Sequence, residues 1–271
     1  MRIRHLNCAT MRPRSERFIH GEGSWLARGR MIAHCLLVET DAGLVLVDAG
    51  LGLDDCADPM GRLGSTFVNV VSPALDPAET AARQVERLGY DRKDVRHIVL
   101  THVDVDHAGG LPDFPHAEIH LYRQELQAIE NPRGMERERY RRCHWAHGPK
   151  WVPHDVDGET FMGLTAVRAI VEPEVLLVPA TGHSRGHAAV AVRDGDGWLL
   201  HCGDAYFHRH EMQEPPRCSA GLSLFQRVVA TDNAARLHNQ AQLRRLALDE
   251  PGVRVFCAHD ENELDGFRDS S

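Results

Sequence analysis

The chain is organised around the stretch Leu100-Thr101-His102-Val103-Asp104-Val105-Asp106-His107-Ala108-Gly109-Gly110. This stretch follows an apolar, β-rich run that begins at Val95, and it places two imidazoles and two carboxylates within six residues. Such groups are costly to bury at the end of a strand unless each has a partner. A metal ion supplies that partner, because imidazole and carboxylate are common ligands of Zn²⁺ and other transition metals. The stretch therefore predicts a metal site, although taken alone it is also compatible with a polar loop.

Further potential ligands stand elsewhere in the chain, each after an apolar run. They are Asp48, His183, Asp204 and His259. Together with the stretch from Thr101 to Gly110, their types and order resemble the metallo-β-lactamase superfamily, whose signature is His-x-His-x-Asp-His followed by small residues. One position departs from that signature, because Asp104 stands where the second His usually is.

The resemblance implies a fold and a set of metal ligands. The fold would be of the α+β class, a four-layer αββα sandwich in which helices cover two central sheets. One metal ion would be held by His102, Asp104 and His183. The second would be held by Asp106, His107 and His259, and both would be bridged by Asp204. The expected cofactors are two divalent metal ions, Zn²⁺ in the first place, with Fe or Mn as alternatives.

Residues near the motifs are candidates for supporting and catalytic roles. Asp48 and His187 are expected to hold the ligands in place by hydrogen bonding rather than to bind metal. Asp106 is expected to act in catalysis as well as in metal binding. Tyr206 is a candidate to contact a substrate carbonyl, as a tyrosine does in the lactonases of the superfamily, although the spacing there differs.

Composition and charge narrow the class of protein. The motif residues run through nearly all of the chain, so we expect one metallo-β-lactamase-like domain over residues 1–271. The net charge of −8 argues against nucleic acid and anionic membranes as partners. No apolar run approaches the ~20 residues needed to span a bilayer. Seven cysteines without a C-x-x-C pair, and an N-terminus without an apolar segment, predict reduced thiols in a cytoplasmic protein. The oligomeric state is left open.

Apolar periodicity predicts strands at 3–6, 32–39, 44–48, 97–100, 118–121, 175–178, 188–192, 198–201 and 253–257. Helices are expected at 122–130 and 233–248. A further helix is expected from Asp76 to Gly89, because Pro77 and a capping box indicate its start. Residues 51–74 and 206–230 are expected to be irregular.

Two segments without clear periodicity, 9–30 and 133–165, are expected to frame the active site. The second mixes charges with scattered aromatic residues, and two interpretations stay open for it: a surface insertion with a few anchors, or a cap that carries specificity. A small organic substrate needs apolar surface, which the metal loops lack. The candidates to provide it are Trp25, Trp145, Trp151 and Phe207.

The favoured function is a metallo-hydrolase that uses a metal-bound hydroxide on a small ester or lactone, resembling the acyl-homoserine-lactone lactonases of the superfamily. The chain has no Gly-x-Ser-x-Gly elbow and no glycine-rich phosphate loop that would indicate another chemistry. Thioesterase and phosphoesterase activities stay open among the hydrolases. Outside them, the alternatives are a di-iron redox protein and a metal-binding protein without turnover. The expected partner is a small-molecule substrate.

Asp104 sets the expected charge of the metal site. If it ligates, two divalent ions are balanced by three aspartates and one hydroxide, and the site is neutral. A neutral site makes bound water more basic and favours neutral substrates over phosphate esters. If Asp104 is too short to reach, the first ion loses a ligand and its position is weakly filled. Direct ligation is favoured, because an uncompensated carboxylate beside the site would be costly.

Overall fold

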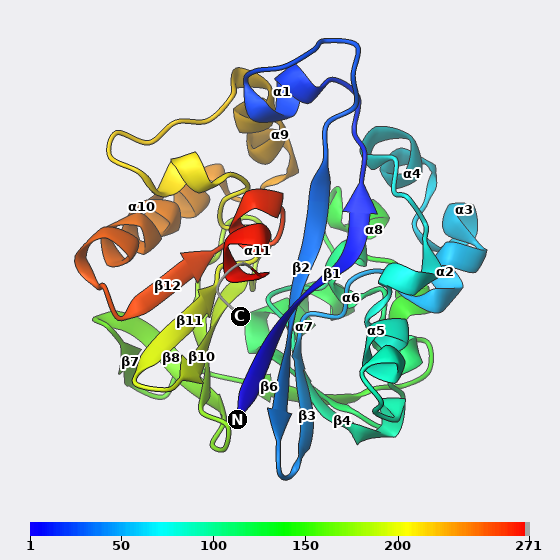
Figure 1. Cartoon of the computed structure of the whole chain (residues 1–271), viewed down its shortest axis with the longest axis vertical. Helices are drawn as coiled ribbons and strands as arrows, with labels where there is room; N and C mark the ends of the chain where they lie inside the picture. Colours follow the sequence, from blue (N-terminus) through cyan, green and yellow to red (C-terminus); the bar gives the residue numbers. More distant parts are fainter. Residues whose placement is uncertain (269–271) are drawn as a thin grey trace.

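The computed structural model describes residues 1–268 and contains two six-stranded sheets packed face to face (Figure 1). The first sheet has the order β1-β2-β3-β4-β5-β6, and the second has the order β12-β11-β10-β9-β8-β7. The strands of the first sheet are β1 (Arg2–Met11), β2 (Met31–Thr40), β3 (Gly43–Val47), β4 (Val95–Val99), β5 (Glu118–Tyr122) and β6 (Lys150–His154). Those of the second are β7 (Glu159–Phe161), β8 (Leu164–Ile170), β9 (Val175–Pro179), β10 (Ala188–Asp194), β11 (Gly197–His201) and β12 (Val253–Phe256).

Helices cover the outer faces of the sheets, with α5 outside the first and α10 outside the second (Figure 1). In chain order the helices are α1 (Glu16–His20), α2 (Leu53–Ala57), α3 (Pro59–Arg62), α4 (Ser65–Val71), α5 (Ala81–Arg87), α6 (Val105–Ala108), α7 (Arg123–Glu130), α8 (Glu136–Arg139), α9 (Ala220–Val229), α10 (Asn233–Asp249) and α11 (Glu261–Arg268). Within residues 1–268, none of these helices combines the length and the apolar character that crossing a membrane requires.

Three apolar layers hold the sandwich together. The layer between the sheets contains side chains of both, among them Val47, Val99, Leu177 and Val190. Outside the first sheet, Ala82 and Val85 of α5 join the cluster of Ile98. Outside the second, Leu243 and Leu246 of α10 join the cluster of Leu200. Strands buried on both faces have near-continuous apolar sequences, which is why the central strands were predictable. The expected αββα sandwich of the α+β class is confirmed.

The topology brings the ends of several strands to one edge of the sandwich. β3, β4 and β5 run parallel, so the residues that follow β3 and β4, including Asp48 and His102, lie at the same edge. In the second sheet β11 and β12 are parallel, and they lead to Asp204 and His259 in the same way. Ligands that are far apart in the sequence can therefore meet across the two sheets.

The local structure predicted for three regions was wrong. Residues 51–74 contain the short helices α2, α3 and α4, none of which is long enough to show a clear apolar period. Residues 206–230 contain α9, whose first turn is capped by Ser219. The helix expected from Asp76 is a 3-10 turn followed by α5, which Thr80 caps. The expected capping box fails because the Glu79 carboxylate instead accepts hydrogen bonds from the backbone N–H and hydroxyl of Thr10, both at 2.7 Å.

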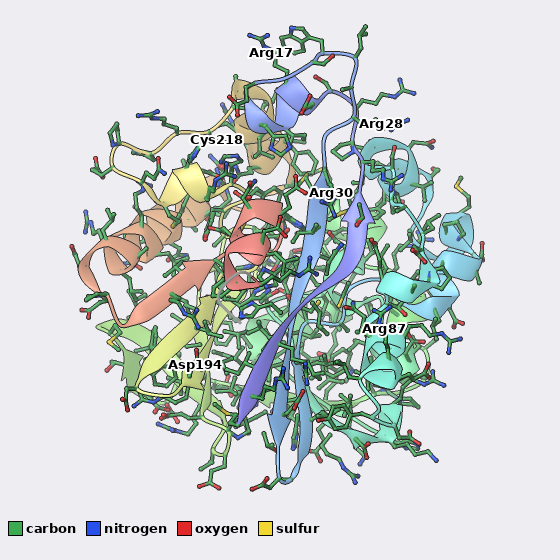
Figure 2. All side chains as sticks on the ribbon, in the orientation of Figure 1. Arg17, Arg28, Arg30, Arg87, Asp194 and Cys218 are labelled. Carbon is green, nitrogen blue, oxygen red and sulfur yellow. The ribbon has the colours of Figure 1, made fainter. Side chains whose placement is uncertain are left out.

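The two segments expected to frame the active site are partly sheet. β1 extends to Met11, so only residues 12–30 form the connection to β2, with α1 inside it. Arg17 and Arg28 mark this connection at one end of the molecule (Figure 2). Residues 133–165 supply β6, which pairs with β5, and β7, which pairs with β8. This segment is therefore an integral part of both sheets, and only its first part, around α8, lies near the cavity described below.

Candidate dinuclear metal centre

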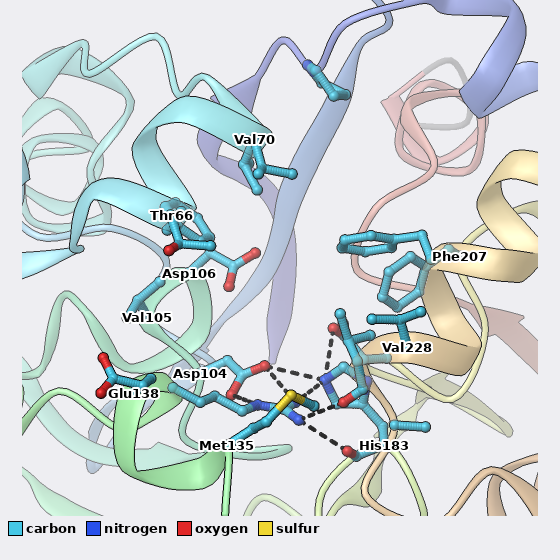
Figure 3. Close-up of a pocket in the computed structure, with 18 of the residues that line it drawn as sticks. Thr66, Val70, Asp104, Val105, Asp106, Met135, Glu138, His183, Phe207 and Val228 are labelled. Atoms are coloured by element: carbon cyan, nitrogen blue, oxygen red, sulfur yellow. Dashed lines mark hydrogen bonds and ion pairs between the residues drawn. The ribbon is translucent and has the colours of Figure 1, made fainter.

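The first set of candidate ligands has four atoms that lie within 4.8 Å of one another. The Asp104 Oδ2 atom lies 3.3 Å from His102 Nε2 and 3.1 Å from His183 Nε2. The Asp204 Oδ2 atom lies 3.7 Å and 3.2 Å from the same two nitrogens. Ligand atoms bound to one tetrahedral zinc ion at about 2.0–2.1 Å are about 3.3 Å apart. The four atoms therefore have the spacing that a single ion requires, with Asp104 and His183 facing each other in Figure 3.

The second set shares one residue with the first. Asp106, His107 and His259 form a buried group of potential ligands. The other oxygen of Asp204, Oδ1, lies 3.2 Å from His107 Nε2 and 3.0 Å from His259 Nε2, and Asp106 Oδ2 is 3.9 Å from His259 Nε2. Asp204 thus presents one carboxylate oxygen to each set, which is the geometry of a bridging ligand.

Unsatisfied polar atoms show that the two sets fit metal ions. Among the described residues, His102 Nε2, His107 Nε2 and Asp204 Oδ1 are buried and have no hydrogen-bond partner. Leaving one such atom unpaired costs roughly 1–3 kcal/mol. All three point into the same two groups of ligands, so cations would satisfy them together. Burial and the nearby charge of His107 lower the pKa of His102 to about 4, which keeps this ring in the neutral form that binds metal.

Hydrogen bonds behind the ligands fix the orientation of their rings. Asp48 accepts from the backbone N–H and the hydroxyl of Thr101 and from His107 Nδ1, each at 2.8 Å. His259 Nδ1 donates to the Ile32 carbonyl at 2.8 Å. When these two rings are neutral, the same hydrogen bonds leave the lone pair on Nε2, which faces the site.

His187 lies behind the bridging carboxylate. Its Nδ1 donates to the Ala180 carbonyl at 2.9 Å, and its Nε2 accepts the backbone N–H of Asp204 at 3.0 Å. Neither ring nitrogen is free to bind metal. Asp48 and His187 therefore contact the ligand residues His107 and Asp204, and their supporting role stays a prediction.

Arg139, which the sequence did not single out, lies against the first ligand set. It is the last residue of α8, and its Nε and Nη2 hold the two oxygens of Asp104. Nη1 donates to the carbonyls of His183 and Val229 at 3.0 and 2.9 Å, and Nη2 also contacts His183 Nε2. Burial opposes ionisation of Asp104, but the guanidinium of Arg139 holds the pKa of this carboxyl well below its usual range.

The Arg139 guanidinium changes the charge expected for the site. Counting it beside Asp104 adds one positive charge to the neutral balance expected from the ligands alone. The pairing also compensates Asp104 without any metal, so the cost of an isolated carboxylate no longer argues for ligation. The spacing of Asp104 Oδ2 to His102 and His183 supports ligation instead. No pattern singles out Arg139, because five arginines stand among residues 133–142.

A large cavity of about 1730 Å³ opens directly above the ligands. Asp104, Asp106, His183, Asp204 and His259 form part of its lining. Its other walls are largely apolar and come from the β1–β2 connection, α3, α4, α8 and α9; they include Phe18, Met31, Phe67, Val70, Met135, Phe225 and Val228 (Figure 3). The walls from α3 and α4 lie in the region that was expected to be irregular.

The aromatic and tyrosine candidates separate into two groups. Trp25 and Phe207 line the cavity. Trp145 and Trp151 were expected in the pocket wall but are absent from the cavity lining. They pack against the core outside the first sheet. Trp151 on β6 is in register with the buried Ile119 of β5 and shares its face. Tyr206 is also displaced from its expected role: it is fully buried in the core of the second sheet, and its hydroxyl donates to Glu263 at 2.9 Å.

The fold and the paired ligand sets define a metallo-hydrolase of the metallo-β-lactamase superfamily. The chain belongs to this superfamily, whose model matches residues 28–259. Among individual proteins, it is similar to a probable metallo-hydrolase of Mycobacterium tuberculosis, with 44% identity over 276 residues that cover 100% of this chain and 84% of the relative. It is also 27% identical to an N-acyl homoserine lactonase of Bacillus thuringiensis over 184 residues, 66% of each chain.

Solved structures share the fold at lower identity. An N-acyl homoserine lactone hydrolase with the product N-hexanoyl-L-homoserine at its catalytic metal centre has a TM-score of 0.71 and 21% identity, covering 97% of this chain and 95% of that one. A dizinc quorum-quenching lactonase, also in complex with a product, has a TM-score of 0.62 and 17% identity. This match covers 95% of the present chain and 86% of the lactonase. At these identities the likeness concerns the fold.

Proposed function

We propose that this protein is a metal-dependent hydrolase of neutral esters or lactones that carry an apolar chain. The observation that carries the proposal is the position of the shared Asp204 carboxylate, which presents one oxygen to each ligand set beneath an apolar cavity. When bound there, two divalent ions would supply an acidified water as nucleophile and a Lewis acid for the carbonyl oxygen. We favour Zn²⁺ for both positions. Asp104 makes the first set richer in oxygen than the usual pattern, so Fe and Mn are the alternatives.

The chain's own residues have distinct tasks in this reaction. Asp104, Asp204 and the histidines hold and orient the ions, while Asp48 and His187 fix the rings and the bridging carboxylate. Asp106 is a member of the second set and also lines the cavity. We infer that its carboxylate accepts a proton from water and delivers it to the leaving alkoxide. Water adds across the acyl–oxygen bond, so a lactone gives a hydroxy acid.

The cavity favours a substrate with an apolar chain. Four of the five N–H groups of Arg139 are engaged by the Asp104 carboxylate and by the carbonyls of His183 and Val229, which leaves at most one donor for an anionic group of a substrate. The apolar walls from α4 and α9 provide the surface on which an acyl chain would be buried. The similarity to the N-acyl homoserine lactonase of Bacillus thuringiensis supports an acylated lactone as the substrate class.

A substrate panel on metal-replete protein tests the proposal. The panel contains N-acyl homoserine lactones of short and long chains, simple esters, thioesters, phosphate esters and β-lactams. We expect lactones and esters to be hydrolysed best, with chelation abolishing turnover and Zn²⁺, Mn²⁺ or Fe²⁺ restoring it. The control is the chelated protein after removal of the chelator, without added metal. Full turnover in a demonstrably metal-free preparation, or preference for phosphate esters, would contradict the proposal.

A further inference from the structure

A separate cluster of imidazoles lies on the first sheet, away from the metal centre. It consists of His97 on β4, Glu118 and His120 on β5, and His154 on β6. His97 Nδ1 is 3.0 Å from His120 Nε2 and 3.7 Å from Glu118 Oε2, and His120 Nδ1 is 3.0 Å from His154 Nε2. His97 precedes His102 by five residues, on the order of 15 Å of extended chain. The cluster shares no residue with the two ligand sets of the metal centre.

The strand register explains why these side chains meet. His97 is paired with Glu118 across the parallel β4–β5 ladder, and His154 is paired with Tyr122 across β5–β6. Glu118, His120 and Tyr122 alternate along β5, so their side chains lie on one face of the sheet. Tyr122 packs in the layer between the sheets, so the cluster lies on that inner face, near the edge that β6 forms.

The cluster is open to solvent on one side and buried on the other. His120 is buried, whereas the His97 and Glu118 side chains are 33% and 46% exposed. An ion can therefore enter from the solvent and meet a ligand that the fold already holds in place. Burial and the neighbouring imidazoles lower the pKa of His120 to about 3, so its ring is neutral at physiological pH.

The spacing matches a three-ligand site. His97 Nδ1, His120 Nε2 and a Glu118 oxygen lie within 4.8 Å of one another. The measured separations of 3.0 and 3.7 Å bracket the value of about 3.3 Å expected for ligands of one tetrahedral zinc ion. If His120 Nδ1 donates to His154, its Nε2 carries a lone pair toward His97, which leaves a single proton between these two rings. A cation can take the place of that proton.

We propose that His97, Glu118 and His120 bind a third divalent transition-metal ion, Zn²⁺ in the first place, outside the dinuclear centre. Two imidazoles and a carboxylate form a ligand set that zinc uses, with the fourth position left to water on the exposed side. His154 holds His120 in the ligating orientation. The ion would tie β4 to β5 near the edge of the first sheet, so its role is to stabilise the fold and not to take part in hydrolysis.

Metal stoichiometry of the full-length protein tests this site. Wild type and His97→Ala are saturated with Zn²⁺, dialysed, and analysed for bound zinc, and the binding is followed by titration calorimetry. We expect His97→Ala to bind one ion fewer per chain, and Glu118→Gln to bind the same ion at least tenfold more weakly. His154→Gln should weaken it about tenfold, as for other residues that orient a ligand. His116→Ala, an exposed histidine outside the cluster, is the matched control and should bind as wild type does.

The result is measured as a difference from wild type, so it does not depend on how many ions the dinuclear centre holds. Hydrolytic activity should be equal in wild type and His97→Ala, which shows that the variant is folded and that its dinuclear centre is intact. Zinc should raise the Tm of wild type further than that of His97→Ala when both start with a loaded dinuclear centre. Equal zinc content in the two proteins, or equal affinity for the last ion bound, would overturn the proposal.

Discussion

Replacing Asp104 and Arg139 singly and together tests whether the two side chains act as one unit. Their charges cancel, and Arg139 also donates to two backbone carbonyls. Asp104→His alone leaves a guanidinium without its carboxylate, beside metal ions of the same sign. Arg139→Met alone leaves the carboxylate without its cation. The double variant restores the charge balance, and it supplies the imidazole that the superfamily usually has at this position.

The expected magnitudes follow from the burial of the pair. Removing one partner of a buried ion pair costs about 3–5 kcal/mol. The two side chains are 16% and 15% exposed, so the low end of that range, about 3 kcal/mol of unfolding free energy, applies to the metal-free protein. A bound ion compensates the free carboxylate of Arg139→Met, which should therefore bind the first ion more tightly than wild type. In Asp104→His the unpaired Arg139 repels that ion, and we expect affinity to fall at least tenfold.

The double variant gives the decisive measurement. We expect it to recover the first-site affinity that Asp104→His loses, with a coupling free energy of about 2 kcal/mol, or about 30-fold in affinity. Affinity is measured by competition with a chromophoric chelator, and stability by urea unfolding of metal-free and loaded protein. Arg137→Met, an exposed arginine on the same short helix, is the control. Additive effects, with coupling below about 0.5 kcal/mol, would refute the view that Asp104 and Arg139 form a unit.

Three further predictions concern the bridge, pH and the cavity. Asp204→Ala should be almost inactive and should lose metal from both positions, because each ligand set loses one oxygen; metal analysis that finds one position still full would contradict this. Burial raises the pKa of Glu263 from 4.5 to about 8, so the folded state retains a proton that the unfolded state releases, and stability should fall as pH rises from about 4.5 to 8. In urea unfolding at a series of pH values, Glu263→Gln should lose less stability than wild type between pH 4.5 and 8. The same pH dependence of stability in both proteins would contradict this prediction. Trp25→Ala should raise KM for long-chain lactones by severalfold and leave short-chain substrates unaffected, because Trp25 lines the cavity and belongs to neither ligand set; equal effects on both chain lengths would oppose this assignment.

The sandwich could be predicted because its strands are apolar runs and its ligands stand at their ends. Because they follow these apolar runs, His102, His183 and Asp204 were predicted to stand at strand ends. The structure brings them together across the two sheets. The local sequence pattern gave the wrong helix start where a contact with a distant strand decides the structure. Glu79 bonds to Thr10 on β1 rather than to its own helix, and no local signal describes that partner.

The cavity was less predictable than the metal ligands. Phe207 and Tyr206 are adjacent aromatic residues, yet the chain turns one into the cavity and the other into the core, where Tyr206 meets Glu263. The sequence carries no signal that separates them, because irregular backbone has no fixed period. Arg139 was hidden for a similar reason: its importance comes from where α8 places it relative to Asp104, and four other arginines stand among residues 133–142.

The ligands are divided between the two sheets, and this has a consequence for biosynthesis. The loop after β4 brings four of them, whereas His183, Asp204 and His259 come from the second sheet, with His259 following its last-made strand. During translation, the second ligand set is complete only when β12 has emerged from the ribosome and docked beside β11, because His259 follows that strand. The chain therefore acquires its full metal complement only after its two halves have closed on each other, and metal uptake in a translation reaction would report the moment of that closure.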